Sequence, residues 1–428
     1  MIYQPPEIDL DRSLDQITNA PSREEPVGFI LRLAKALHTY GVPAYELEQT
    51  INACADTLGY GVQCLSTPTA ITLTLLPKGS KPETFVIRVP PGVVNMHKLQ
   101  QISDIAEQVM KGDIAPPTGA RLLKEVAKQP PLYASWVIVL AFTLVSGSIS
   151  RIFLGGLGEI VTASSIGFAI GLLSILSRYS PFLKYLFPSI ASFIGTLVAF
   201  TLNHYWSYNT SIYVSLVAGL IILLPGLTLT IAMAELATEN LVSGTARLFS
   251  AATIFVQLGF GSAMGSQIGQ MLYGNIEAVN LTPVSDWSVW IAVLLGSVAL
   301  VPLFAAKVKD SIWIVFAGLI AFATVRYTSP YIGASLSAFV GAIVIGLSAK
   351  IISSLSRIPG ALIVMPGFIM LVPGSVGYKS IMALVQKDII HGMETGLDVL
   401  LIGISLVGGL LLSSLVRLPR REEGDDDL

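Results

Sequence analysis

Two short Pro-Gly segments interrupt stretches that are otherwise apolar enough to cross a bilayer. They read LLPG at 223–226 and LVPG at 371–374, 148 residues apart. Proline removes a backbone donor and glycine adds an entropic cost, so the pair is unfavourable inside a helix. The first N–H groups of a helix that restarts after such a break lack partners and carry partial positive charge. The two segments therefore predict a place that binds an anionic group such as a carboxylate.

Polar side chains close to the breaks extend this candidate site. The hydroxyl groups of Thr228 and Thr230 follow the first break, and that of Ser375 follows the second. A further Pro-Gly pair at 366–367 predicts another interruption just upstream, with irregular backbone over nearly three turns. The predicted solute-binding residues are Pro225, Gly226, Thr228, Thr230, Pro366, Gly367, Pro373, Gly374 and Ser375.

Five carboxylates lie within or beside the apolar runs, where a charge is costly and usually faces a cavity or a partner. Glu159 and Asp398 are flanked by apolar sequence, and Glu235 and Glu239 share one helix face. An interfacial position near a helix end is the alternative for each of them. The predicted proton-coupling residues are Glu159, Glu235, Glu239, Asp388 and Asp398.

No catalytic or metal-binding pattern accompanies these residues. The chain lacks a P-loop, an HExxH, a GxSxG and any zinc spacing, and its two cysteines, Cys54 and Cys64, do not form a CxxC. We therefore expect neither an enzyme nor a cofactor or metal site. The net charge of −2 gives no basic footprint, so nucleic acid is not an expected partner.

The elements that position these residues follow from an uneven composition. Hydrophobic residues make up 53% of the chain and charged residues only 13%, whereas a soluble protein carries roughly a quarter charged residues. From about Leu132 onward, apolar runs of ~20 residues match the ~30 Å hydrocarbon core of a bilayer. We predict ten membrane-spanning helices, near 132–150, 152–176, 185–204, 212–232, 246–272, 288–305, 311–326, 332–354, 360–378 and 394–416.

The predicted spans form two related halves. A shift of 148 places 219–244 on 367–392 with seven identical pairs among 26, and it also places the first five spans on the last five. Because five is odd, the second half starts on the opposite side of the membrane, which predicts inverted-topology repeats. Loop charges favour cytoplasmic termini, since inside segments then hold thirteen Lys and Arg residues and outside segments four. In the fifth span, Gly261, Gly265 and Gly269 predict a close-packing helix face.

A small soluble domain is expected before the first span. Helical spacing in 26–40 and 43–58 is followed by strand-like runs in 62–77 and 83–90 and by two more short helices. The predicted fold class is a membrane α-helical protein: ten transmembrane helices as two five-helix inverted-topology repeats, preceded by a small α+β cytoplasmic domain. The predicted parts are a flexible arm at 1–25, the soluble domain at 26–130, the membrane repeats at 131–278 and 279–418, and an acidic tail at 419–428.

Three segments resemble the threonine/serine exporter family: RLAKALHTYGVPAYELEQTINACADTLG, LLPGLTLTIAMAELATENLVSGTARL and PGFIMLVPGSVGYKSIMAL. The first two resemble the family's N-terminal region, and the third is similar to its smaller C-terminal region, which some bacteria carry as a separate chain. The resemblance covers roughly residues 27–416. It implies a ten-span secondary exporter in the cell membrane that moves threonine and serine outward, driven by the proton gradient. Both solutes carry the carboxylate expected above.

Two other functions remain open. Split members of the family are associated with succinate export, so a dicarboxylate exporter is one alternative, for which Lys379 and Lys387 could supply cationic groups. A membrane-anchored binding or signalling module, with 26–130 as the working part, is the other, although ten spans in repeats argue against it. The expected partners are a small carboxylate-bearing solute and the lipid bilayer, and a homo-oligomer is compatible with the sequence.

Overall fold

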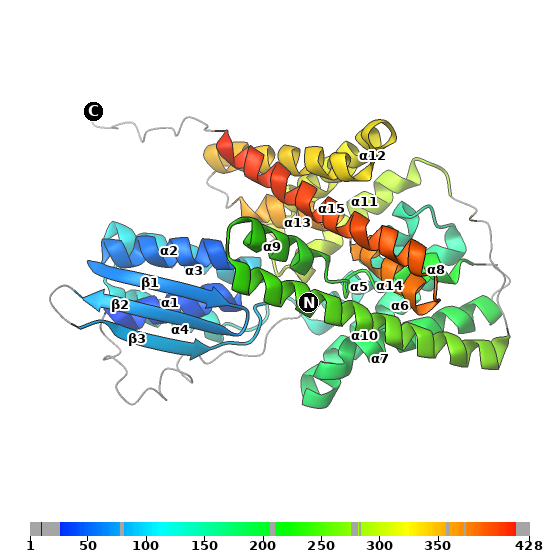
Figure 1. Cartoon of the computed structure of the whole chain (residues 1–428), viewed down its shortest axis with the longest axis horizontal. Helices are drawn as coiled ribbons and strands as arrows, with labels where there is room; N and C mark the ends of the chain where they lie inside the picture. The colour runs from blue at the N-terminus through cyan, green and yellow to red at the C-terminus, as the bar shows by residue number, and fades with distance from the viewer. Residues whose placement is uncertain are drawn as a thin grey trace. The chain divides into compact units, whose positions relative to one another are not determined.

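The computed structural model describes most of the chain (Figure 1). The described residues are 10, 26–77, 81–205, 210–274, 281, 284–356, 360–371 and 374–416. They form two compact units. The first holds the described residues up to Leu132 together with Ile231–Phe249 and Phe304–Ala306, and the second holds Tyr133–Thr230, Ser250–Leu303 and the described residues from Lys307 onward. The predicted arm at 1–25, except for Leu10, and the predicted tail at 419–428 lie outside the described residues, as does Pro373.

The first unit contains the predicted combination of helices and a small sheet. Its first elements are α1 (Pro26–Thr39), α2 (Ala44–Thr57), β1 (Tyr60–Thr67), β2 (Ala70–Pro77), β3 (Glu83–Arg88), α3 (Met96–Lys111) and α4 (Pro116–Lys128). The strand-like run at 62–77 contains two strands, because the chain turns at Pro68 and Thr69 between β1 and β2. Proline and the short polar side chain of threonine both favour such a turn.

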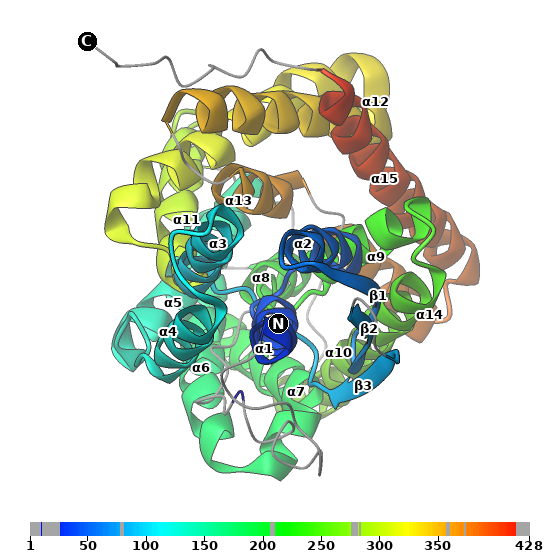
Figure 2. The ribbon, with the colours of Figure 1, turned by 90° about the vertical axis from the view of Figure 1, so that its left-hand side faces the viewer.

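One face of the sheet carries the core of this unit. The antiparallel strands lie in the order β1-β2-β3, with Val62 opposite Leu75 and Leu73 opposite Phe85. Alternate residues of the central strand, Ile71, Leu73 and Leu75, are at most 1% exposed, because successive strand side chains point to opposite faces. Figure 2 shows α1 and α2 beside the sheet and α3 and α4 on the far side of α1. Apolar residues of α1 therefore pack on both sides.

Helix α3 is fixed at both ends. The side chain of Asn95 caps its start by accepting a hydrogen bond from the N–H of Lys98 at 3.0 Å, and Gly112 ends it with a φ of 82°, a backbone conformation that glycine adopts at little cost. The N–H of Met96 also donates to the carbonyl of Phe304 at 2.9 Å. This bond places the short segment 304–306 within the first unit.

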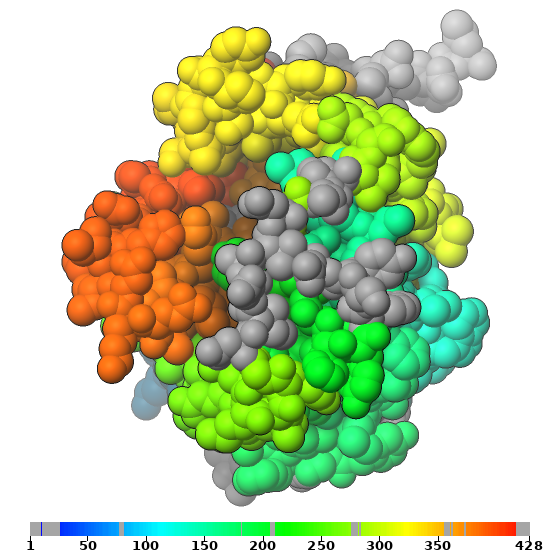
Figure 3. All heavy atoms as spheres, turned by 90° about the vertical axis from the view of Figure 1, so that its right-hand side faces the viewer, coloured from blue at the N-terminus to red at the C-terminus, as the bar shows by residue number. Residues whose placement is uncertain are grey.

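The second unit is helical, and two helices run from one unit into the other. Its helices are α5 (Ser135–Ile152), α6 (Leu157–Leu176), α7 (Pro181–Tyr205), α8 (Ile212–Gly219), α11 (Ser288–Leu303), α12 (Ser311–Ser356), α13 (Ala361–Leu371), α14 (Gly374–Val385) and α15 (Ile389–Leu415). Helices α9 (Gly226–Ala237) and α10 (Leu241–Tyr273) each have residues in both units. Figure 3 shows yellow to orange residues of α12 and the helices that follow it, and teal to green residues of α7, α8 and the end of α10, in separate parts of one face.

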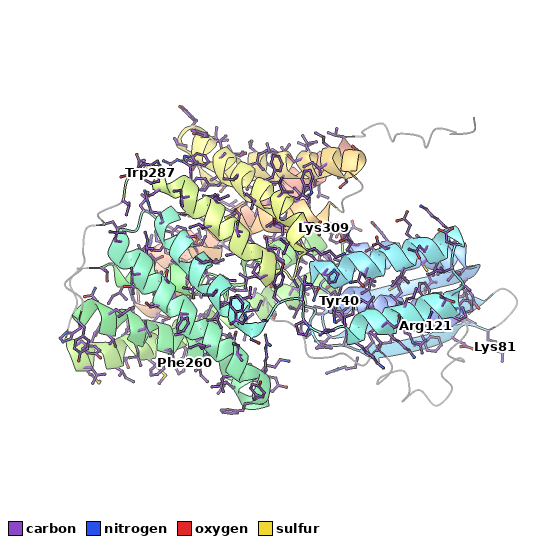
Figure 4. All side chains as sticks on the ribbon, turned by 180° about the vertical axis from the view of Figure 1, so that it is seen from behind. Tyr40, Lys81, Arg121, Phe260, Trp287 and Lys309 are labelled. Atoms are coloured by element: carbon purple, nitrogen blue, oxygen red, sulfur yellow. The ribbon has the colours of Figure 1, made fainter. Side chains whose placement is uncertain are left out.

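Seven helical segments among the described residues are long and apolar enough to cross a membrane. The protein is therefore a multi-pass membrane protein, but the predicted number of ten spans is not confirmed. One segment combines two predicted spans, because α12 is 46 residues long and includes both. Gly333 lies inside it, and its φ of 76° and ψ of 174° are not helical. Helix α11 is shorter than the usual span, with 16 residues. Exposed apolar side chains surround this unit, among them Phe260 and Trp287 at its periphery (Figure 4).

The predicted glycine face of the fifth span is confirmed. A Cβ atom at Gly265 would stand 2.7 Å from the Cβ of Thr196 on α7, and one at Gly269 would stand 2.5 Å from the ring of Phe200. Real Cβ atoms do not approach so closely. Glycine therefore permits α7 and α10 to pack at short range, as small residues do in other membrane proteins.

Candidate functional site

The first Pro-Gly segment lies between two helices, as predicted. Helix α8 ends at Gly219, turn residues follow, and α9 starts at Gly226. The carbonyl of Pro225 accepts a hydrogen bond from the N–H of Leu229 at 3.0 Å. Pro225 and Gly226 are both buried. The first N–H groups of α9 therefore begin a new helix inside the protein, without acceptors from a preceding turn.

The second Pro-Gly segment lies partly outside the described residues. Helix α13 is described as far as Leu371, and α14 is described from Gly374, which is buried. Residues 372–373 lie outside the described residues, so the interruption predicted there stays a prediction.

The described start of α14 lies against the first break. A Cβ atom built on Gly374 would stand 3.2 Å from the Cβ of Leu224 and 3.5 Å from the Cα of Gly226. A side chain at position 374 would therefore touch Gly226 at an ordinary distance and Leu224 more tightly. Segments that are 148 residues apart in the sequence therefore meet in one buried place. This meeting point is our candidate functional site.

Three hydroxyl groups predicted for the site differ in their availability. Thr230 is 2% exposed, and its hydroxyl donates to the carbonyl of Gly226 within α9 at 3.3 Å. Thr228 and Ser375 are half-buried, and neither side chain has a hydrogen-bond partner in the described part of the chain. Thr228 and Ser375 therefore retain a donor for a bound solute, whereas the Thr230 hydroxyl is used inside the helix.

A buried tyrosine lies one turn beyond the second helix start. Tyr378 is 0% exposed, and its hydroxyl is 2.6 Å from that of Ser262 on α10. We did not single out either residue from the sequence. The sequence feature that could have identified Tyr378 is its spacing of four residues from Gly374, which places Gly374 and Tyr378 on one face of α14. Tyr378 and Ser262 add a polar pair to the surroundings of the candidate site.

The interruption predicted at 365–367 is absent. Helix α13 runs without a break from Ala361 to Leu371, with Pro366 inside it. Pro366 and Gly367 are buried, and a Cβ atom at Gly367 would stand 2.7 Å from Ile345 on α12. Packing against α12 holds this segment helical despite the missing N–H of the proline. Among the described residues, the predicted irregular backbone is therefore the segment that precedes α9.

The helices after the two breaks end in the same way. Helices α9 and α14 both contain 12 residues, and Glu239 and Lys387, 148 residues apart, have left-handed φ angles of 64° and 65°. In the first turn the N–H of Asn240 donates to the carbonyl of Glu235 at 2.8 Å, and the corresponding bond in the second turn measures 2.9 Å. Both turns are Schellman motifs. The shift of 148 seen in the sequence thus also relates backbone geometry.

Glu159 joins two helix starts. Its Oε2 accepts a hydrogen bond from the N–H of Gly156 at 2.9 Å, and its Oε1 accepts one from the N–H of Ser211, just before α8, at 2.8 Å. The side chain is only 4% exposed. A carboxylate is stabilised at the N-terminus of a helix. Glu159 therefore has a structural role in fastening α8 to α6, and its predicted role in proton coupling stays a prediction.

Glu235 lies in the first unit and is fully buried. Its carboxylate accepts hydrogen bonds from the N–H of Ala44 at 3.0 Å and the hydroxyl of Ser243 at 2.8 Å. The Nε of Arg247 lies 3.0 Å from both of its oxygens. Sequence analysis named Glu235 but missed Arg247, which lies twelve residues further on. The turn between α9 and α10 brings the two side chains together.

The remaining predicted carboxylates are exposed. Glu239 occupies the left-handed position of the first turn. Asp388 caps α15 by accepting a hydrogen bond from the N–H of His391 at 3.2 Å. Asp398 lies on an exposed face of α15. None of the five candidates contacts the meeting point of Gly226 and Gly374 through a hydrogen bond found among the described residues.

Several further buried polar groups in the second unit were not identified from the sequence. Arg151 is 2% exposed and donates through Nε to the hydroxyl of Ser288 at 2.7 Å, while its Nη1 has no partner in the described structure. The hydroxyls of Ser150 and Ser215 are also buried without a partner there. A buried polar group without a hydrogen bond is unfavourable. These groups therefore mark places where a bound solute or water would be stabilised.

Comparison with protein families identifies two matching regions. A family model described as a threonine/serine exporter matches residues 28–269, and a second model, described as "Threonine/Serine exporter, ThrE", matches residues 289–416. The first match contains the break at Pro225, and the second contains the break at Gly374. No solved structure matches this chain.

Several curated fungal proteins are similar to the chain over part of their length. Pheromone-regulated membrane protein 10 of Eremothecium gossypii is 25% identical over 342 residues, which cover 76% of this chain and 45% of the relative. An uncharacterized protein of Schizosaccharomyces pombe is 25% identical over 340 residues, covering 77% and 45%. The protein of the first name from Kluyveromyces lactis is 27% identical over 279 residues, covering 64% and 29%. The chain therefore spans less than half the length of these relatives.

Proposed function

The chain belongs to the threonine/serine exporter family, and from this premise we propose that it is a secondary transporter that exports threonine or serine. The family match and the apolar helices indicate a membrane transporter rather than an enzyme. The substrate, the driving ion and the direction of transport are parts of the proposal. We place the protein in the plasma or inner membrane with both termini in the cytoplasm.

The contact between the two interrupted helices carries this proposal. Gly226 starts α9, and Gly374, the first described residue of α14, lies against it inside the second unit. Non-helical backbone at membrane depth is tolerated where it is buried in protein or lines a path for solutes. Paired half-helices whose N-termini meet near the midplane are a common design for carboxylate-bearing solutes. The hydroxyls of Thr228 and Ser375, free of partners in the described chain, would add donors for the solute.

We further propose ten spans in two inverted repeats. If α12 were straight, its 46 residues would extend ~69 Å, more than twice the ~30 Å core of a bilayer. Division at Gly333 gives two spans. Counting α8–α9 and α13–α14 as one broken span each then yields five spans before and five after residue 280. The matching turns at Glu239 and Lys387 support a repeat of this length.

Exposed aromatic residues support the same division. Tyr327 and Tyr331, close to Gly333, are 65% and 87% exposed, and Trp287, just before α11, is 65% exposed. Tyrosine and tryptophan concentrate where a membrane meets water. We therefore assign the Gly333 bend and the start of α11 to the outer surface of the membrane.

Proton coupling is the least supported part of the proposal. Of the five candidate carboxylates, Glu159 and Glu235 already accept hydrogen bonds on both oxygens. The other three are exposed. Asp398 is the candidate within a span whose carboxylate makes no hydrogen bond or ion pair in the described chain. We propose Asp398 as the first residue to test for coupling.

One observation favours the dicarboxylate alternative. The buried guanidinium of Arg151 leaves Nη1 without a partner in the described residues, and a fixed buried cation suits a solute with a second negative charge. Lys379 and Lys387, the cations suggested by the sequence, are exposed. A succinate exporter therefore remains the second candidate function. A binding or signalling module is less well supported, because it gives no role to the buried contact of the two helix starts.

Efflux from cells tests the proposal directly. Cells lacking the gene, with and without the gene restored, would be loaded with threonine- or serine-containing dipeptides or with succinate, and each solute would be measured outside. We expect gene-dependent efflux of threonine or serine that a protonophore abolishes. Gene-dependent efflux of succinate alone would favour the alternative. Absence of gene-dependent efflux for all three solutes would contradict the proposed function.

A further inference from the structure

A buried ion pair lies within the α9–α10 hairpin of the first unit. Glu235 is 0% exposed, and the Arg247 side chain is 13% exposed, with its Nε 3.0 Å from the carboxylate. The hydroxyl of Ser243 donates to the same carboxylate at 2.8 Å. Removing charges from water is costly, so a pair this deeply buried depends on complete hydrogen bonding.

The carboxylate of Glu235 also binds a helix of the N-terminal domain. The N–H of Ala44, the first residue of α2, donates to Oε1 at 3.0 Å. Pro43, which precedes α2, makes no side-chain cap, so Glu235 takes the place of a capping residue. A carboxylate at this end of a helix is stabilised by the helix dipole. One side chain of α9 thus pairs with α10 and caps α2.

The second half of the chain has the same hairpin but not the pair. A shift of 148 places Ala383, His391 and Thr395 at the positions of Glu235, Ser243 and Arg247. The Thr395 hydroxyl bonds within its own helix, to the carbonyl of His391 at 2.7 Å. The second turn closes with the same backbone hydrogen bonds without any charge at these places. The ion pair is therefore not needed to form the hairpin, and its distinct contact is the one with α2.

Helix α9 connects this contact with the candidate site. It starts at Gly226, in the second unit, and reaches Glu235, in the first. Their separation of nine residues corresponds to a distance of ~14 Å along a continuous helix. A displacement of α2 that carries Glu235 with it would therefore be passed along α9 to its first turn.

We propose that the Glu235–Arg247 pair is a latch through which the N-terminal domain positions the helix start at Pro225–Gly226. Glu235 is a positioning residue in this assignment and does not touch the solute. The latch gives the domain at 26–130 a function: whatever moves the start of α2 changes the place where the two interrupted helices meet. The consequence for transport rests on the proposed function, whereas the mechanical connection does not.

Hydrogen–deuterium exchange of the full chain in lipid nanodiscs tests the connection. The variants are Glu235→Gln, which leaves Arg247 without its anion, and Arg247→Lys, which keeps a cation. The matched control is Glu125→Gln, because Glu125 pairs with Arg121 in the same unit on an exposed surface, at 2.8 Å. Exchange would be followed in the start of α2 and in residues 227–232 of α9.

We expect Glu235→Gln to speed exchange at least tenfold in both segments, Arg247→Lys to change it less than threefold, and Glu125→Gln to leave it unchanged. Faster exchange in α2 alone would show that Glu235 only caps α2 and does not position α9, and the proposal would be wrong. Unchanged exchange in both segments would also overturn it. If Glu235→Gln does not accumulate in the membrane, Arg247→Gln serves with the same criteria.

An efflux assay adds the functional readout. A positioning role predicts that Glu235→Gln lowers the maximal rate of threonine or serine efflux at least fivefold, with Arg247→Lys restoring most of it. Equal rates in wild type and Glu235→Gln, together with altered exchange in α9, would separate the latch from transport and contradict its positioning role. Since the exchange experiment needs no solute, failure of the substrate assignment would leave its result intact.

Discussion

Buried ionisable side chains in this protein differ in how many of their polar atoms have hydrogen-bond partners. Glu159 holds two backbone N–H groups, and Glu235 holds a backbone N–H, a hydroxyl and a guanidinium. Arg151 leaves one nitrogen without a partner in the described chain. A buried ion costs several kcal/mol unless such bonds are complete. The satisfied carboxylates therefore have structural roles, and unsatisfied groups such as Arg151 are where contact with a solute is expected.

His38 in the N-terminal domain makes stability depend on pH. It is 2% exposed, and burial, with a smaller contribution from the charge of Arg247, lowers its pKa from 6.5 to about 4. The unfolded chain takes up a proton below pH 6.5, and the folded chain does not until about pH 4. Stability is therefore complete above pH 6.5 and falls as the pH falls toward 4. Between pH 7 and pH 5 we expect wild type to lose about 2 kcal/mol relative to His38→Gln.

The reaction of Cys54 with a thiol reagent measures this loss of stability. Cys54 is buried in the same domain, so its reaction with a thiol reagent reports unfolding. The urea midpoint for Cys54 exposure would be compared between wild type and His38→Gln at each pH, where both proteins meet the same reagent chemistry. A difference between the two proteins that is equal at pH 7 and pH 5 would contradict the assignment to His38.

Glu159 and Asp398 should respond differently to neutralisation. Glu159→Gln removes an acceptor from one of two buried N–H groups, so we expect a loss of about 1–3 kcal/mol of stability and a lower thermal midpoint. Asp398→Asn lies on an exposed face, so we expect a change within ~0.5 kcal/mol and a flatter pH dependence of efflux. If efflux keeps the wild-type pH profile in both variants, neither residue carries the coupling proton.

At the scale of elements, the two half-helices depend on local sequence and on packing together. Proline and glycine favour a break in a helix. Pro366 shows that a Pro-Gly pair does not by itself cause one, because α13 stays helical around it. The difference lies in the surroundings. Gly367 packs on Ile345 of a neighbouring helix, whereas Gly374 packs on the backbone of the other break.

A methyl group at Gly374 tests the contact between the breaks. In Gly374→Ala the new Cβ would stand 3.2 Å from the Cβ of Leu224, so Leu224 must move by a few tenths of an ångström. We expect efflux to fall at least fivefold while the protein still inserts in the membrane. Gly408→Ala is the matched control, because a Cβ there meets Phe339 at an ordinary 3.5 Å. Equal loss in both variants would mean that the effect is not specific to the site.

At the scale of the whole molecule, the number of spans decides the topology. The described structure contains seven helical segments that meet the length and hydropathy of a span. Ten spans require that α12 cross twice and that α11 and the broken helices cross as well. In the ten-span count five spans separate the two matching turns, at Glu239 and Lys387, which places them on opposite sides of the membrane.

Labelling of single cysteines distinguishes the two topologies. In a background without Cys54 and Cys64, Tyr331→Cys near the Gly333 bend and Tyr179→Cys after α6 both replace exposed residues. For ten spans we expect a membrane-impermeant thiol reagent, added outside intact cells, to label Tyr331→Cys and to label Tyr179→Cys only after permeabilisation. If Tyr331→Cys is protected until permeabilisation, the Gly333 bend is not outside and the inverted repeat is contradicted.

Much of the architecture could be predicted from the sequence because it depends on local chemistry. Apolar runs of bilayer length, strand-like alternation and the first Pro-Gly break identify membrane helices, the small sheet and the start of α9. The shift of 148 identifies the related halves. The same reasoning named Glu235 and Gly374 but could not say what each contacts, because spacing along one chain does not give distances between elements.

Tertiary structure decided the contacts that link distant residues. It brought Gly374 to Gly226, Arg247 and Ala44 to Glu235, and Ser262 to Tyr378. It also kept Pro366 within a helix, against the expectation from local preference. Burial supplies the physical reason: once water is excluded, each polar group takes the partner that packing offers, and each helix continues or breaks according to the energy of the whole interface.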